Sequence, residues 1–451
     1  MASVERSSIA SRSILLINPP SPPGLAANRE GAGGLGAWGS GEAGFIYPPQ
    51  ALAYAAAVLR SAGWTVRLLD AAGERLGSDA AMRRIREQPL ERIIAVQVAS
   101  ISLDNDIGFL ERLRAVAPRS RLLAIGVATA FVAPQLLERT DVDHVVVGEP
   151  EAMLLPTCQV LAGESEVRRL HRRVTPADLS VAGVDGEGRL LDLDTLPFPA
   201  WDLVPLERYG FVTMLVSRGC DDTCAFCPYV VGQGRHLRSR QPEHVVDEMA
   251  WLAATVRLPR LILRDPVFAY ERARVERICQ GVIERKVRLA WECESRPEHF
   301  DASLLRLMRR AGCVAVKLGL ETTSEHVLRS LRRIAPTDTA GAYLQQTATV
   351  VAACRMLGIA CRLFVMTGLP GQTDEDIVET IDFLRQVRPT SIHVKPFYRY
   401  PGLPMPGAAT ADDRQRGERQ AALMSAAVAP TLARPSFVGK ARRWLARRLQ
   451  R

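Results

Sequence analysis

One segment constrains this chain more than any other: residues 217–229, where three cysteines fall within eight positions. Cys220, Cys224 and Cys227 are spaced Cys-x3-Cys-x2-Cys. An apolar run at residues 211–216 comes just before them and predicts a buried strand. Thiolates select zinc or iron–sulfur clusters, and three of them on one short loop can converge on a single soft metal centre.

Two alternatives to an iron–sulfur cluster stay open at this point. Structural zinc takes four protein ligands, but no second cysteine pair follows the loop, and the nearest histidine, His236, lies nine residues beyond Cys227 in a basic stretch. The other alternative is a chance group of reduced cysteines without a metal. We favour a four-iron cluster, because three cysteine ligands would leave one iron open to bind a small molecule.

The spacing, with the aromatic Phe226 before the third cysteine, resembles the signature of the radical S-adenosylmethionine (radical SAM) superfamily. The preceding Arg-Gly-Cys and the basic run at residues 235–240 resemble the subset that carries a cobalamin-binding-like domain in front. This resemblance implies a [4Fe-4S] cluster ligated by Cys220, Cys224 and Cys227, with S-adenosylmethionine (SAM) on the open iron. It also implies an electron donor such as flavodoxin or ferredoxin.

Length and composition set the broad class. The 451 residues are enough for two domains with full cores. We expect a cytoplasmic protein, because no apolar run approaches the roughly 20 residues of a membrane span and residues 1–12 lack a signal core. The nine cysteines show no regular pairing, as in a reducing compartment. Part of the net charge of +9 lies in the basic tail 440–448, which we expect to be a solvated helix, so neither a nucleic-acid nor a membrane partner is expected.

Short apolar runs alternate with helical patterns in the first part of the chain. Strands are expected at residues 13–18, 65–70, 93–98, 121–126 and 144–148, helices at 48–63, 80–87, 104–117 and 133–139, and a glycine-rich loop at 24–44. Such alternation predicts a parallel sheet covered on both faces, with ligands beyond the carboxyl ends of its strands. We therefore expect an α/β fold with a Rossmann-like domain over residues 1–165 and a connector over 166–210.

The first domain resembles the cobalamin-binding-type domain of the radical SAM subset in Asn18-Pro19-Pro20, Pro48-Pro49, Asp70 and the segment 147–151. It departs from that pattern twice. The stretch Asp70-Ala71-Ala72-Gly73 lacks the histidine that many cobalamin proteins supply to cobalt, and Gly126-Val127 replaces a Gly-Gly pair along which the cofactor tail would run. Cobalamin binding is therefore uncertain, and the alternative is a vestigial domain that only supports the barrel or an interface.

Strand–helix units repeat after the cysteine loop and predict a partial (βα)6 barrel over residues 211–405, with a basic helical tail over 406–451. Its strands are expected at 211–218, 261–265, 287–294, 314–321, 360–366 and 391–397. Ionisable residues gather at the strand ends, among them Glu294, Lys317, Glu321 and Lys395. Alternation places Lys317, Gly319 and Glu321 on one face and His393 and Lys395 on one face, so we expect a site at the barrel mouth.

Roles at this mouth come from position and from the resemblance. Asp265, at the second strand's end, is the candidate partner of the SAM ammonium group on position alone. The resemblance implies that Phe226 contacts adenine, that Gly319 and Glu321 lie near the ribose or substrate, and that the backbone at Gly368 approaches adenine. For the glycines, an ordinary strand-to-helix turn is the alternative.

The superfamily generates a 5′-deoxyadenosyl radical that abstracts hydrogen from an unactivated carbon. One expected reaction is radical dehydration of a vicinal diol in an aminoglycoside (amino-sugar) natural product, as in the radical SAM diol dehydratase of apramycin biosynthesis, which the chain resembles. Glu321, Lys317, Lys395 and Glu294 are the acid and base candidates, and mouth carboxylates would suit a polycationic substrate. The alternatives are a cobalamin-dependent radical methyltransferase of secondary metabolism and a cluster-bearing regulator that is no enzyme.

Overall fold

The computed structural model describes residues 12–39, 45–257, 260–405 and 411–433. The chain forms two compact units. The first contains residues 1–221, 228–240 and 400–402, and the second contains residues 222–227, 241–399 and 403–451. This division assigns the expected connector and Cys220 to the first unit, and Cys224 and Cys227 to the second. The domain boundaries expected at residues 165, 210 and 405 stay a prediction.

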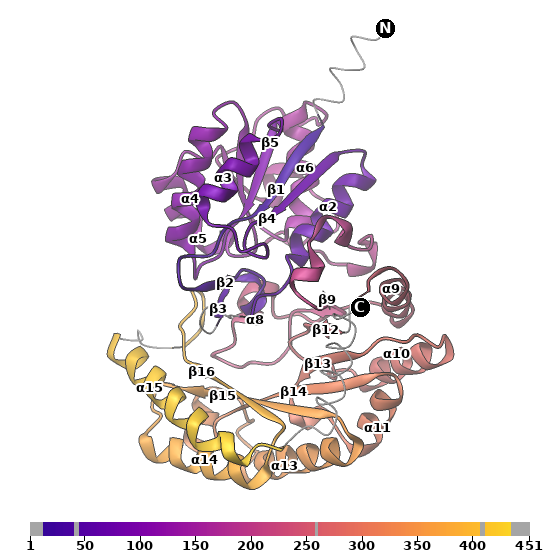
Figure 1. Ribbon diagram of the computed structural model, residues 1–451, viewed down its shortest axis with the longest axis vertical. Coiled ribbons are helices and arrows are strands. Elements are labelled where there is room, and N and C mark those ends of the chain that lie inside the picture. Colours follow the sequence, from indigo (N-terminus) through magenta and orange to yellow (C-terminus); the bar gives the residue numbers. More distant parts are fainter. Residues whose placement is uncertain (1–11, 40–44, 258–259, 406–410, 434–451) are drawn as a thin grey trace, which may run out of the picture. The chain divides into compact units, whose positions relative to one another are not determined.

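The first unit is built on a six-stranded parallel sheet (Figure 1, indigo to magenta). The strand order is β4 (Thr65–Asp70), β1 (Ser13–Asn18), β5 (Ile93–Gln97), β6 (Arg121–Ile125), β7 (His144–Val146) and β8 (Arg173–Val174). The register sets Asn18 beside Asp70 and Ile17 beside Val96. Strands buried on both faces form nearly continuous apolar runs in a sequence, which is why five of the six were expected within two residues of their ends.

Helices cover both faces of this sheet. α2 (Gln50–Ser61) and α6 (Pro150–Ala162) share one core with side chains such as Leu16 and Leu123. α3 (Ser78–Arg86), α4 (Leu103–Val116) and α5 (Thr129–Arg139) share the other core with Leu15 and Ile94. Neighbouring residues of one strand thus enter opposite cores, as the pleat of a strand requires.

Residues 24–39 form structure where we expected only a loop. β2 (Ala26–Asn28) pairs antiparallel with β3 (Ala37–Gly39), and the 3-10 turn η1 (Ala32–Gly34) lies between them. Arg29 of this segment donates hydrogen bonds to Pro19 O (2.7 Å) and Asn18 Oδ1 (3.3 Å) at the end of β1, and forms an ion pair with Asp106 of α4. The segment is therefore anchored at the carboxyl edge of the sheet by a buried cation.

The connector is pinned to the first unit, as its proline-rich and aromatic composition predicted. It contains β8, α7 (Pro176–Leu179) and three 3-10 turns, η2 (Leu193–Thr195), η3 (Trp201–Leu203) and η4 (Leu206–Arg208). Trp201 is buried, and Ala200 N donates to Ala53 O of α2 at 3.0 Å. A flexible linker would lack both contacts.

The second unit contains five parallel strands in the order β16 (Ser391–Pro396), β15 (Ala360–Thr367), β14 (Cys313–Glu321), β13 (Trp291–Ser295) and β12 (Leu261–Leu263). The helices are α9 (Pro242–Thr255), α10 (Arg272–Glu284), α11 (Ala302–Arg310), α12 (Glu325–Ser330), α13 (Ala340–Leu357) and α14 (Asp374–Val387). Figure 1 shows α11, α13 and α14 along one side of this sheet. With β9 (Val212–Met214) of the first unit, six strands follow the expected alternation, and the α/β class with a partial barrel is confirmed.

A last helix, α15 (Ala411–Val428), packs on β15 and β16 beside α14 (Figure 1, yellow). A Cβ atom at Gly368 would lie 2.9 Å from Gly417 Cα, and Thr367 Oγ1 donates to Gly417 O at 2.8 Å. The first part of the expected helical tail is thus part of the second unit, whereas its basic stretch 440–448 lies outside the described residues. Within the described ranges, no helix combines the length and apolarity that a membrane crossing requires.

We expect Arg29→Met to lower the free energy of unfolding by about 3–5 kcal/mol, because Asp106 would keep a buried charge without its cation. The side chains of Arg29 and Asp106 are 1% and 0% exposed. Urea unfolding followed by circular dichroism measures the change.

The matched control is Arg112→Met, which breaks the exposed ion pair between Arg112 and Asp79 in the same unit. We expect that variant to keep nearly the wild-type free energy of unfolding, because exposed ion pairs contribute little to stability. Equal losses in the two variants would contradict the anchoring role of Arg29.

Candidate active site

A buried ion network in the first unit holds the first half of the cysteine loop. β10 (Ser217–Arg218) pairs antiparallel with β11 (Arg238–Ser239). Arg218 Nη1 lies 2.9 Å from Glu149 Oε2 and its Nη2 pairs with Glu151, while Arg238 Nη2 lies 2.9 Å from Glu149 Oε1. Burial alone would raise the pKa of Glu149, but Arg218 and Arg238 outweigh it and hold this pKa below its usual value. The Gly-Glu-Pro-Glu and Arg-Gly-Cys motifs are therefore two sides of one network.

Gly219 brings Cys220 against the segment that follows α8 (Pro228–Gln233). Its φ is +77°, and a Cβ atom there would lie 2.2 Å from His236 O. Cys220 N donates to Gly234 O at 3.3 Å. Only glycine can occupy this position, both because of its left-handed backbone and because of the close approach.

Arg296, which follows β13, holds the second half of the loop within the second unit. Its Nη1 lies 2.9 Å from Asp222 Oδ2 and 3.9 Å from Cys224 Sγ. Ala225 N donates to Leu331 O at 2.9 Å. Burial raises the pKa of the Cys224 thiol, and the nearby guanidinium groups of Arg333 and Arg296 oppose this rise.

The donor set on this loop fits an iron–sulfur cluster. Cys220 and Cys224 are buried, Cys227 is half-buried, and none of the three forms a disulfide with another described cysteine. Cations beside Cys224 favour the thiolate form that ligation requires. Over the residues that the structure describes, no three Cys, His, Asp or Glu side chains are arranged to hold a single metal ion. The assignment of the three cysteines as ligands therefore stays a prediction that rests on their spacing and donor chemistry.

Lys317 of β14 lies between two glutamates of β13. Its Nζ is 3.0 Å from Glu292 Oε1 and 3.2 Å from Glu294 Oε1, and Lys317 is buried. We expected mouth carboxylates to serve a polycationic substrate. These two carboxylates instead share an ion pair with Lys317 inside the protein, and Glu292 also pairs with Arg260. The argument for a polycationic substrate is therefore corrected for this pair.

Glu321 ends β14 in a left-handed backbone conformation, with φ of +64°. A Cβ atom at Gly319 would lie 2.3 Å from Glu321 Oε1, so Gly319 leaves the room that this carboxylate needs. Gly319 O accepts hydrogen bonds from Arg333 Nη2 and Tyr343 Oη, both at 2.6 Å. Burial raises the pKa of Glu321, and Arg333, Lys395 and Arg296 oppose this rise.

Lys395 of β16 is exposed, and its Nζ lies 5.1 Å from the centre of the Phe364 ring. Although water reaches the side chain, protein surrounds much of it, and this loss of hydration lowers the pKa of Lys395; Glu294 and Glu321 oppose the shift. His393 is exposed too, but the protein around its ring and the charge of Lys395 lower its pKa to about 4, so His393 is uncharged at neutral pH. The structure thus brings Lys395, Glu294, Glu321 and Lys317 into one electrostatic group.

The other expected cofactor residues lie in different surroundings. Asp265 is completely buried, and its charge contributes to the raised pKa of the Cys293 thiol. Phe226 packs against an apolar cluster that includes Leu369, next to Gly368. Gly368 lets α15 approach closely, because a side chain at that position would collide with Gly417. Contacts of Asp265, Phe226, Gly319 and Gly368 with SAM stay predictions.

Two arginines of this site were missed by the sequence analysis. Arg296 lies two residues beyond the expected strand 287–294, so inspection just past the strand ends would have found it. Arg333 lies in the loop after α12 and carries no sequence signal. Its place is apparent only from its contacts with Gly319, Tyr343 and Cys224.

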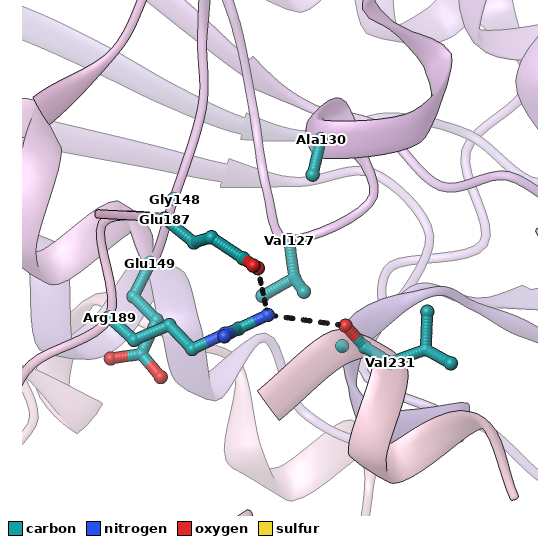
Figure 2. Close-up of a pocket in the computed structure, with 8 residues that line it drawn as sticks. Val127, Ala130, Gly148, Glu149, Glu187, Arg189 and Val231 are labelled. Carbon is teal, nitrogen blue, oxygen red and sulfur yellow. Dashed lines mark hydrogen bonds and ion pairs between the residues drawn. The ribbon is translucent and has the colours of Figure 1, made fainter. Parts of the chain in front are cut away.

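The carboxyl edge of the first sheet was the expected place for cobalamin. Figure 2 shows a small hollow there, at the ends of β6 and β7, with Arg189 extending across it toward Val231 O at 3.5 Å. Val127 projects into this hollow. A Cβ atom at Gly34 would lie 3.0 Å from Val127 Cβ, and one at Gly232 would lie 3.3 Å from Val127 Cγ1.

Residues 30–36 close the same edge further along. Leu35 O accepts hydrogen bonds from Ser100 N (3.0 Å) and Ser100 Oγ (2.7 Å), and Glu30 Oε1 accepts one from Gln97 Nε2 (2.9 Å). A Cβ atom at Gly36 would lie 2.7 Å from Ala99 Cβ. The residues described at this edge therefore do not fit a buried cobalamin tail along Gly126 and Val127.

Residues 214–384 match the family model of the Radical SAM superfamily. An uncharacterized methyltransferase of Pyrococcus horikoshii is 22% identical over 347 residues, which cover 75% of this chain and 73% of the relative. An anaerobic magnesium-protoporphyrin IX monomethyl ester cyclase of Rubrivivax gelatinosus is 26% identical over 369 residues, or 78% of this chain and 64% of the relative. The chain thus spans less than two thirds of the second relative.

Two solved structures share the fold over most of this chain. The radical SAM methyltransferase TsrM of Kitasatospora setae, with cobalamin and a [4Fe-4S] cluster bound, aligns with a TM-score of 0.67 and 19% identity over 87% of this chain and 77% of TsrM. The cobalamin-dependent SAM radical enzyme OxsB, with aqua-cobalamin and SAM bound, aligns with a TM-score of 0.63 and 16% identity over 94% of this chain and 58% of OxsB. This chain therefore carries a radical SAM domain and shares the fold of these two radical SAM enzymes.

Proposed function

We propose that this protein is a radical SAM lyase that removes water from a vicinal diol of an aminoglycoside intermediate, without cobalamin. The observation that carries the proposal is the group formed by Glu294 of β13, Lys317 and Glu321 of β14, and Lys395 of β16 in the second unit. Loss of hydroxide from carbon needs both an acid and a base, and this group offers both. Transfer of a methyl group to a carbon radical needs no proton on a leaving oxygen.

The packing of the first unit supports the same reaction class. Val127 and residues 30–36 fill the sheet edge along which a cobalamin tail would run. Chemistry that needs no cobalamin is consistent with that filling. The likeness to the apramycin diol dehydratase, noted from the sequence, suggests an amino-sugar substrate for antibiotic biosynthesis.

The cluster and SAM, when bound, supply a 5′-deoxyadenosyl radical, which removes a hydrogen atom from a carbon that bears a hydroxyl group. In our proposal Glu321 accepts the proton of that hydroxyl, and Lys395 delivers a proton to the neighbouring hydroxyl, which leaves as water. One further electron from an external reductant and one proton complete the product, so the substrate loses one water in total. Lys317 orients Glu294 beside these groups.

The partners and the compartment are part of the proposal. The nine cysteines all lie in described residues and form no disulfide with one another, which suits a reducing compartment such as the cytoplasm. A flavodoxin or ferredoxin would supply the electrons. We propose no nucleic-acid and no membrane partner.

A cobalamin-dependent radical methyltransferase is the second candidate. The names of two comparisons favour it: the relative from Pyrococcus horikoshii is called a methyltransferase, and TsrM is a radical SAM methyltransferase. The two candidates differ in both the cofactor required and the mass of the product.

To separate them, the anaerobically reconstituted protein is incubated with SAM, a reductant and a pseudodisaccharide precursor, with and without added cobalamin. We expect a product lighter by one water in both reactions, together with methionine and 5′-deoxyadenosine. Mass spectrometry measures all three. A methylated product and S-adenosylhomocysteine, formed only with cobalamin, would contradict the lyase proposal and support the second candidate.

Removal of one proposed ligand by Cys224→Ala should abolish the cluster, because two thiolates cannot replace a three-cysteine set. We expect loss of iron, sulfide and the brown colour after reconstitution. Cys158→Ala is the control, since Cys158 is buried in α6 of the first unit and should leave loading intact. Full iron and sulfide in Cys224→Ala would contradict the assignment of that ligand.

Glu321→Gln should lower the rate of product formation by about 100-fold or more, the usual contribution of a general base. Formation of 5′-deoxyadenosine should persist, because radical generation does not use this carboxylate. In the wild type the rate should fall at low pH, as Glu321 takes up a proton at its raised pKa, and at high pH, as Lys395 loses its proton at its lowered pKa.

Two variants check the pH assignment. Lys395→Met should remove the alkaline limb of the profile. His393→Gln should keep both limbs above pH 5, because the pKa of His393 is about 4. A profile of Glu321→Gln with the wild-type rate and acid limb would exclude Glu321 as the base.

A further inference from the structure

The guanidinium of Arg296 contacts one of the predicted cluster ligands. Its Nη1 lies 3.9 Å from Cys224 Sγ, within the range of an N–H···S hydrogen bond. The side chain is 15% exposed, so the charge acts through protein more than through water. No role of Arg296 follows from the spacing of the cysteines alone.

Several contacts fix the position of this guanidinium. Nη1 lies 2.9 Å from Asp222 Oδ2, two residues before Cys224. Nη2 donates to Arg333 O at 2.7 Å and to Glu298 Oε1 at 2.6 Å. A side chain tied to three partners has little freedom to leave the sulfur, so the contact is preorganised.

The neighbouring charges act in opposite directions. Arg333 is a second cation near Cys224, itself held by Gly319 O. Glu298, in the 3-10 turn η5 (Pro297–His299), is the anion bound to Arg296. Burial alone would raise the pKa of Glu298, but Arg333 and Arg296 outweigh it, so the carboxylate is ionised near neutral pH.

We propose that Arg296 is a positioning residue that raises the reduction potential of the cluster by donating an N–H···S hydrogen bond to Cys224, and that Glu298 partly offsets this effect. The inference rests on the cluster ligation proposed above. Reduction adds one electron to the cluster, and a nearby cation stabilises the more negative state. Hydrogen bonds to the sulfurs and the charge around a cluster set its potential.

The test measures the midpoint potential of the reconstituted full-length protein, by a redox titration followed by electron paramagnetic resonance without SAM or substrate. Arg296→Gln should shift the midpoint to more negative values. At one fixed solution potential the ratio of reduced to oxidised cluster should fall about tenfold, which corresponds to about 59 mV for a one-electron couple. Glu298→Gln should shift the midpoint in the opposite direction.

Midpoint shifts of opposite sign in Arg296→Gln and Glu298→Gln would show that the charges tune the potential. Damage to the loop would instead shift the midpoints of both variants in the same direction. Arg296→Lys keeps the positive charge but loses the planar guanidinium, so its midpoint should lie between those of the wild type and Arg296→Gln. If Arg296→Gln takes up no iron, Arg296→Lys replaces it in the test. The control is Arg277→Gln, an exposed arginine of α10 paired with Glu243, whose midpoint should equal that of the wild type.

Midpoints equal to the wild type in Arg296→Gln and Glu298→Gln, or shifts of the same sign in both, would overturn the inference. Where Arg296→Gln takes up no iron, a wild-type midpoint in Arg296→Lys together with an unshifted Glu298→Gln would also overturn it. Failure of the proposed function has a different signature. In that case the wild-type protein would lose no water from the diol, or would hold no cluster at all, whereas the titration needs the cluster but no substrate.

Discussion

The cysteine loop depends on arginines that are buried together with their counter-charges. Arg218 lies between Glu149 and Glu151 in the first unit, and Arg296 lies between Asp222 and Glu298 in the second. Burying a guanidinium is costly unless its hydrogen bonds are made and its charge is balanced. Each arginine therefore has few alternative positions, and the loop segments attached to them are restricted in the same way. Three thiols can bind one metal centre only if the loop holds them in fixed positions. The main effect of the ion pairs is therefore to fix the loop, more than to add stability.

Much of the fold could be predicted because most strands are buried on both faces. The runs at 13–18 and 65–70 match β1 and β4 residue for residue. Two missed helices have a common physical cause. α6 and α9 were not placed, and both begin at a proline, Pro150 and Pro242. Proline is read as a helix breaker, but it is well suited to the first helical turn, where its missing N–H would have no partner.

The candidate site was predictable in its members but not in its pairings. Alternation placed Lys317 and Glu321 on one face of β14, and it placed Lys395 on one face of β16 together with His393. The structure brings Lys317, Glu321 and Lys395 together with Glu294. Sequence could not show that Lys317 neutralises Glu292 and Glu294, because that depends on the register between β13 and β14. It also could not show Arg333, which reaches the site from a loop. Charge counted along a sequence therefore overstated the carboxylate available to a cationic substrate.

The first unit has a structural reason to be retained even where its sheet edge takes no cofactor. Glu149 and Glu151 follow β7, at the carboxyl edge of the sheet, and this edge is where Rossmann-like folds place their functional groups. Here these two carboxylates bind Arg218, two residues before Cys220. The ion pairs with Glu149 and Glu151 fix Arg218, and the close approach of Gly219 to His236 O fixes the start of the cysteine loop. This edge of the sheet thus supports the loop that carries the three cysteines.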